Sequence, residues 1–145
     1  MKRIELERES ILIGIYCDVV TNLLKIHGQL SIIKTLVFAY IIKKGKFIPD
    51  KIYTAKNSKD IVCKCISLLS GDYEEYCNNI QYIIKSIHIL ISAGKLSING
   101  DLLIQCKSAD ASTSIYTEDS FIEKAIKKSR NMTDRQFLKE VIQNV

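Results

Sequence analysis

Apolar residues at steps of three and four predict two helices near the start of the chain. From Ser10 to His27 this spacing defines one helical face. The face consists of Leu12, Ile15, Tyr16, Val19, Leu23 and Ile26. After Gly28, a second helix is expected from near Gln29 or Ser31 to Lys44. Its apolar stripe, which indicates burial, consists of Ile32, Ile33, Leu36, Val37, Tyr40 and Ile41.

Two more helices are predicted on either side of Ser70-Gly71. The first begins after a cap at Asn57 or Ser58, and its inner face consists of Ile61, Val62, Cys65, Ile66 and Leu69. The second begins at Asp72, forms a capping box with Glu75 and extends to Ala93. Apolar residues occur around most of this helix, so we expect it to be the central helix of the domain.

A β-hairpin is predicted after Gly94, because Asn99-Gly100 lies between two short apolar runs and both residues tolerate positive φ. Two registers are open. A two-residue loop pairs Leu96 with Leu103, whereas a three-residue loop pairs Ile98 with Leu102.

The last part of the chain is expected to form a surface loop over 107–116 and a pair of short helices over 117–145. Thr117 caps the first, with Tyr116 and Phe121 as a hydrophobic staple, and Thr133 with Gln136 forms a capping box for the second. The apolar face of the last helix either completes the core or docks a partner. Its residues are Phe137, Leu138, Val141 and Ile142.

Together these elements predict a mainly α protein. We expect a single domain over residues 1–145, with about six helices and one winged-helix-like hairpin before the two C-terminal helices. A composition of 47% hydrophobic and 26% charged residues is typical of a folded globular chain. The five cysteines are an odd number, which favours a reducing cytoplasm over a secreted disulfide framework.

Export and membrane insertion are not expected. Met1–Glu9 lacks the apolar core of a signal peptide. The most apolar stretches are interrupted by Asp18, Lys25, Lys34 and Lys43, well before the roughly 18 apolar residues of a spanning helix.

No catalytic or cofactor site is evident in the sequence. Cys63 and Cys65 form the only close cysteine pair, and two residues apart on a helix they point in different directions. His27 and His88 are the only histidines, and both are interpreted as capping or core residues. We therefore expect neither an enzyme nor a bound metal or cofactor.

The most unusual charge feature is a lysine-rich segment between the second and third helices. Its seven lysines against Asp50 and Asp60 give +5, the net charge of the whole chain. The candidate contacts to phosphates or to an acidic surface are Lys43, Lys44, Lys46, Lys51, Lys56, Lys59 and Lys64. The alternative is a solvated loop.

A helix followed by a hairpin also suggests a winged-helix nucleic-acid-binding or regulatory protein. In such a protein the helix before the hairpin is expected to be basic. Here it begins Asp72-Tyr73-Glu74-Glu75 and has only Lys85 within it. The shape is therefore expected without the DNA-reading use, and nucleic-acid binding remains the alternative function.

From about Arg8 to Val145 the chain resembles the small middle component of bacterial ABC-three-component (Lamassu-type) antiviral defence systems. The first matching passage is the apolar second helix that ends in Lys43-Lys44 before Ile48-Pro49. The second is the run from Leu90 to Ile98 that enters the hairpin, and the third is the end from Thr133 to Val145.

The resemblance implies a non-catalytic adaptor subunit in the cytoplasm. Its expected partners are a chromosome-maintenance or Rad50-like ATPase and a separate effector protein, with DNA reached indirectly through the complex. Independently of the resemblance, the C-terminal helical pair over 117–145 is a candidate docking element, with completion of the core as the equal alternative.

Overall fold

Six α-helices, one 3-10 turn and a small sheet form the part of the chain that the computed structural model describes, residues 2–45, 58–106 and 120–144. In chain order the elements are α1 (Lys2–His27), β1 (Gln29–Ser31), α2 (Ile32–Lys44), α3 (Ser58–Ile66), η2 (Ser67–Leu69), α4 (Tyr73–Ser92), β2 (Leu96–Asn99), β3 (Leu102–Gln105), α5 (Ser120–Ser129) and α6 (Asp134–Asn144). This mainly α fold, with a hairpin before two short C-terminal helices, confirms the predicted fold class.

Helix α1 is longer than its apolar pattern predicts. It begins at Lys2 instead of Ser10, because an anchored helix extends cheaply through charged residues. An ion pair between Arg3 and Glu7, one helical turn apart, supports the added segment. The predicted face is also partly wrong. Ile26 is exposed, and the buried residues are Tyr16, Val19, Val20, Leu23, Leu24 and His27.

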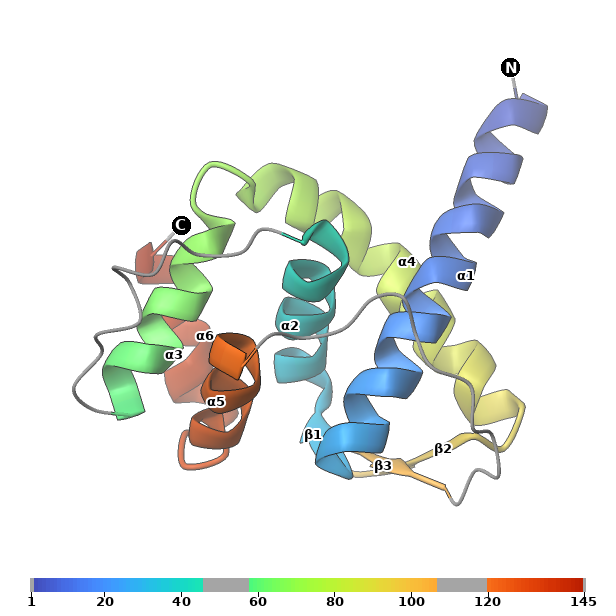
Figure 1. The fold of residues 1–145 in the computed structure, drawn as a ribbon. Helices are drawn as coiled ribbons and strands as arrows, with labels where there is room; N and C mark the ends of the chain where they lie inside the picture. The colour runs from blue at the N-terminus through green and yellow to red at the C-terminus, as the bar shows by residue number, and fades with distance from the viewer. Residues whose placement is uncertain (1, 46–57, 107–119, 145) are drawn as a thin grey trace.

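The central helix is α2, which corrects the expectation for α4. Eight of the 13 residues of α2 are buried. Helices α1 and α4 pack on one side of it and α5 and α6 on the other (Figure 1). Helix α4 lies at the outside against α1, so its residues Ile84 and Ile89 remain exposed. Its buried apolar residues are Tyr76, Ile83, Ile87 and Leu90.

The hairpin is present, and a third strand joins it. The antiparallel sheet has the order β1-β3-β2, with Leu30 opposite Leu103. Neither predicted register is correct, because Ile98 pairs with Leu103 and the two-residue loop is Gly100-Asp101. Gly100 has φ +64° at the first loop position, the place that glycine takes in a type II′ turn.

The predicted helix caps have mixed outcomes. Asp72 makes no capping bond with its side chain at the start of α4. Thr133 and Gln136 do form the capping box of α6. The backbone amide of Gln136 donates to Thr133 Oγ1 at 3.1 Å. The loop at 107–116 and the cap at Thr117 lie outside the described residues.

Helices α3, α5 and α6 form a group on one side of α2. Helix α3 packs on both α5 and α6. The rings of Phe38 on α2 and Phe137 on α6 have centroids 5.5 Å apart, which ties the last helix to the centre of the core.

Candidate functional site

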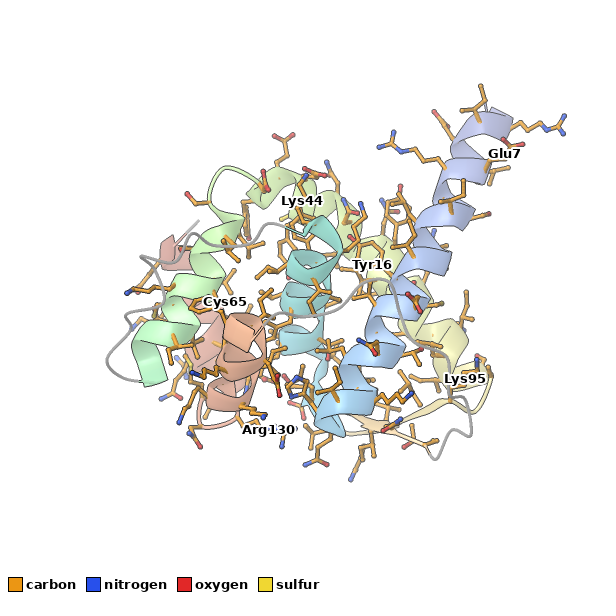
Figure 2. All side chains as sticks on the ribbon, viewed as in Figure 1. Glu7, Tyr16, Lys44, Cys65, Lys95 and Arg130 are labelled. Atoms are coloured by element: carbon orange, nitrogen blue, oxygen red, sulfur yellow. The ribbon has the colours of Figure 1, made fainter. Side chains whose placement is uncertain are left out.

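Within the described residues, the cysteines do not belong to a group of side chains that could hold a metal. No three His, Cys, Asp or Glu side chains that could hold a metal lie together there. The five cysteines form no disulfide. Cys65 of α3 is buried (Figure 2). Cys63 Sγ donates to Glu140 Oε2 at 3.2 Å. Burial raises the pKa of the Cys17 thiol, which keeps it protonated and weakly nucleophilic.

The two histidines lie in different surroundings. His27 is buried at the end of α1, and its backbone carbonyl accepts a hydrogen bond from Arg130. His88 is exposed on α4, so the interpretation as a capping or core residue is wrong for His88. Its place on the outward side of α4 follows from the position of α1 on the other side of that helix.

The lysine-rich segment lies only partly within the described residues. The described side chains are those of Lys43, Lys44 and Lys64. The side chains outside the described part are those of Lys46, Lys51, Lys56 and Lys59. A joint binding surface of these seven lysines therefore stays a prediction.

Lys44 is paired within its own chain. Its Nζ lies 2.7 Å from Glu75 Oε2 near the start of α4. The hydrogen bond between them raises the pKa of Lys44 and lowers the pKa of Glu75. Lys44 therefore offsets part of the acidic start of α4, a role that differs from the predicted contact with a phosphate.

Tyrosines hold α4 against α1 and α2. Tyr16 Oη donates to Asn79 Oδ1 at 2.9 Å, and Asn79 Nδ2 donates to the Glu75 carbonyl at 2.8 Å. The rings of Tyr40 and Tyr76 meet edge to face, with centroids 5.5 Å apart. Burial raises the pKa of the Tyr16, Tyr40 and Tyr76 hydroxyls. This buried network is structural.

Lys34 forms a buried clamp that sequence reasoning missed. Its Nζ donates to the carbonyl of Ser129 at 2.7 Å, at the end of α5, and to the carbonyl of Met132 at 2.6 Å, in the turn that follows. A cation at this position interacts favourably with the negative end of the α5 dipole. Arg130, in the same turn, donates to the carbonyl of His27 (Figure 2). These three hydrogen bonds join the C-terminal helices to α1 and α2.

A cleft of about 340 Å³ opens beside this clamp, between the start of α2, the hairpin loop and the turn before α6. Lys34 and Arg130 contribute positive charge to its wall, and Asp101 and Asp134 contribute negative charge. Because the formal charges cancel, the cleft selects neither an anion nor a cation.

The exposed side of α4 mixes apolar and polar side chains, and the helix has an acidic start. Tyr73 and Ile84 are exposed and lie on the same side of the helix, because 11 residues span about three turns. Glu74 and Glu75 occupy the first turn. A helix that reads DNA presents cations and hydrogen-bonding side chains to the groove. Gln81, Lys85 and His88 are exposed on α4, but Lys85 pairs with Glu9 and the first turn of the helix is acidic.

The first part of α1 projects from the body as an arm (Figure 1). The arm, residues 2–11, carries Ile4 at 69% exposure together with exposed Leu6 and Ile11. Figure 2 shows side chains standing out from it around Glu7. An ion pair between Glu9 and Lys85 marks where the arm meets α4. The sequence reasoning missed this arm because it began the helix at Ser10.

The four candidate docking residues of α6 fall into two sets. Phe137 and Val141 are buried in the chain's own core, so their proposed role in docking a partner is corrected. Leu138 is 39% exposed and Ile142 is 68% exposed. These two remain candidates. Residues at positions i and i+4 share a helical face, which explains the split.

The described C-terminal helices are basic. Residues 120–144 contain six Lys and Arg side chains and three carboxylates, a net charge of +3. Lys127 pairs with Glu123 at 3.0 Å on α5. A groove of about 520 Å³ runs along α6, lined by Lys128, Asn131, Met132, Gln136, Lys139, Glu140 and Gln143. This positive charge can be read from the sequence, but the lysine-rich segment over residues 43–64 is the more prominent charge signal.

By length and composition, α1 is the one helix within the described residues that could cross a membrane. In its most apolar window, 33% of the residues are buried inside the protein. The core helix of a protein that spans no membrane passes the same test. The expectation that the chain does not span a membrane stays a prediction.

Comparison with protein-family models, with curated proteins and with solved structures found no match.

Proposed function

We propose that this protein is a non-catalytic adaptor subunit that joins two other proteins. In the defence complex that its sequence suggests, these are a chromosome-maintenance or Rad50-like ATPase and a separate effector, in the cytoplasm. DNA would then be reached through the ATPase. The proposal requires two separated binding surfaces on one small fold.

The supporting observation is the presence of exposed apolar side chains at two opposite ends of the molecule. Ile4 and Ile11 lie on the α1 arm, and Leu138 and Ile142 lie on α6. Figure 1 shows the arm and α6 on opposite sides of α2. Large apolar side chains held in water are typical of surfaces that a partner covers.

A winged-helix nucleic-acid-binding or regulatory protein is the second candidate. The sheet order β1-β3-β2 and the hairpin after α4 favour it. The acidic start of α4 argues against direct reading of DNA bases. If lysines bind phosphates, changing Lys46, Lys51, Lys56 and Lys59 together to Gln flattens the salt dependence of binding, because fewer counterions are released. A loss of affinity with the same salt slope would indicate specific contacts instead.

Co-purification from the native cells, under nuclease treatment, tests the adaptor directly. A tagged chain at its native level is expected to bring down a large ATPase and one further protein in fixed ratio. Recovery of the chain alone, or with nucleic acid as its sole companion before nuclease treatment, would contradict the proposal.

A further inference from the structure

The outer face of α6 combines positive charge with apolar side chains. This face consists of Arg135, Leu138, Lys139 and Ile142, at positions i, i+3, i+4 and i+7 of one helix. All four side chains are exposed. The opposite side of α6 is fixed in the core by Phe137, so the outer face is held in one orientation toward solvent.

The carboxylates of α6 face away from this set. Glu140 accepts a hydrogen bond from the Cys63 thiol of α3. Burial lowers the pKa of the Lys34 ammonium, and the nearby charge of Asp134 partly offsets that effect. Among the residues that the structure describes, none forms an ion pair with Arg135 or Lys139. Within the described residues, the two cations of the outer face are therefore not engaged in ion pairs by the two carboxylates of α6.

The neighbouring groove is lined by two lysines and by the carboxylate of Glu140. Lys139 borders both the outer face and the groove, and Lys128 of α5 lies at the other wall. Gln136 and Gln143 also line the groove and can donate hydrogen bonds from their side-chain amides. A partner that covers Leu138 and Ile142 could thus place carboxylates along Arg135, Lys139 and Lys128.

We propose that the outer face of α6 binds an acidic amphipathic helix of a partner protein. The partner's apolar side chains cover Leu138 and Ile142, and its Asp or Glu side chains meet the flanking cations. This complementarity gives specificity and speeds association. The inference rests on the adaptor function proposed above, and it specifies the chemistry of one partner surface.

A protein partner explains this face better than a nucleic acid does. Phosphates need cations, but they give no reason for Ile142 to be 68% exposed beside Leu138. Single strands stack their bases on aromatic side chains, and the outer face of α6 has none. Alternation of cations with aliphatic residues is the pattern that an acidic amphipathic helix complements.

Selection from a displayed library of 16-residue random peptides against the full-length folded protein tests the inference. Selected peptides are expected to carry Glu or Asp between Leu or Ile residues at helical spacing. R135E/K139E and L138S/I142S are each expected to weaken such a peptide at least about tenfold. The matched control K2E/R8E makes the same change in charge on the α1 arm and should alter affinity less than about twofold.

Three results would overturn the inference. The first is recovery of no binding peptide, or of peptides without acidic residues. The second is equal weakening by K2E/R8E, which would indicate bulk charge. The third is a 20-base-pair DNA duplex that binds more tightly than any peptide and depends on Arg135 and Lys139 but not on Leu138 and Ile142. Circular dichroism and thermal melting of each variant establish that it is folded.

The adaptor function and this inference can fail separately. If the native complex co-purifies unchanged with L138S/I142S, the α6 inference fails and the adaptor stands. If selected peptides bind the outer face of α6 but no protein partner co-purifies from native cells, the adaptor fails and the face stands.

Discussion

Lys34 shows how much one side chain contributes to joining the parts of this fold. Lys34 is 6% exposed, and burial lowers the pKa of its ammonium. The ammonium nevertheless donates hydrogen bonds to two carbonyls, those of Ser129 and Met132. An uncompensated buried charge is costly, so these bonds are what make the position tolerable. The sequence pattern treats Lys34 only as an interruption of an apolar stretch, because its partners lie 95 and 98 residues away.

Replacing Lys34 with Met is expected to lower the free energy of unfolding by about 2–4 kcal/mol. The methionine keeps most of the side-chain volume but leaves the Ser129 and Met132 carbonyls without that donor. Urea unfolding at pH 7 measures the change. The control K124M alters an exposed lysine and should shift stability by less than about 0.5 kcal/mol. Equal effects of the two substitutions would contradict the clamp.

The buried tyrosines predict a loss of stability in alkaline solution. Burial raises the pKa of Tyr16, Tyr40 and Tyr76 in the folded state above the ordinary value near 10. Their contribution is fully present below that value and is lost as pH rises above it, because the unfolded chain releases its protons first. The lowered pKa of Lys34 acts in the opposite direction, but one lysine opposes three tyrosines.

Urea unfolding between pH 8 and 11 is therefore expected to show stability falling above about pH 10. Y16F removes one of the three hydroxyls and should make that fall shallower. The control Y82F changes a tyrosine outside this set of three. A pH dependence that is identical in Y16F and in the unmodified protein would show that Tyr16 does not contribute to it.

At the scale of elements, replacement of glycine by alanine is expected to have opposite effects on stability at two positions. Gly14 lies inside α1, is exposed, and a Cβ there would have open space. Gly14→Ala should stabilise the protein by about 0.5–1 kcal/mol, because alanine favours the helix. Gly100 has φ +64°, so Gly100→Ala should destabilise it by about 1 kcal/mol. Effects of the same sign would contradict the account of α1 or of the hairpin loop.

The division of α6 into a buried side and an exposed side is testable in the same way. F137A should lower the free energy of unfolding by about 3–5 kcal/mol, because Phe137 is fully buried against Phe38. L138S/I142S should change it by less than about 1 kcal/mol. Thermal melting compares the stability of F137A with that of L138S/I142S.

Deletion of 133–145 is expected to unfold the chain, because it removes the buried side of α6. A folded truncated monomer would show that α6 is only a docking element.

Local chemistry predicts some elements well and others poorly. Helical periodicity identifies α2, α4 and α6, and the Thr133–Gln136 capping box is correct because both residues act within one turn. The register of the hairpin could not be predicted. Strand β1 pairs with β3 across more than 70 residues, and the Ile32 amide donates to the Asp101 carbonyl at 2.9 Å. Such tertiary bonds override local turn preference.

For the whole molecule, the sequence predicts the fold class more fully than the candidate surfaces. The choice of α2 as the central helix depends on which helices cover it, and the apolar pattern of α4 alone gives the wrong answer. Phe137 and Leu138 are equally apolar neighbours, but only the packing of α6 on Phe38 separates a core residue from an exposed one. The α1 arm could not be predicted from the sequence either. Residues 2–11 are recognised as an arm only because the rest of the fold does not reach them (Figure 1).

In the proposed adaptor function, two separate surfaces of one non-catalytic chain bind two different proteins. Quantitative mass spectrometry of the complex purified from native cells tests it, with the α1-arm variant I4S/I11S compared with L138S/I142S. Each variant is expected to lose one partner by at least about tenfold and to keep the other. Loss of both partners together in both folded variants, or of neither, would contradict the claim that this protein joins two partners through separate surfaces.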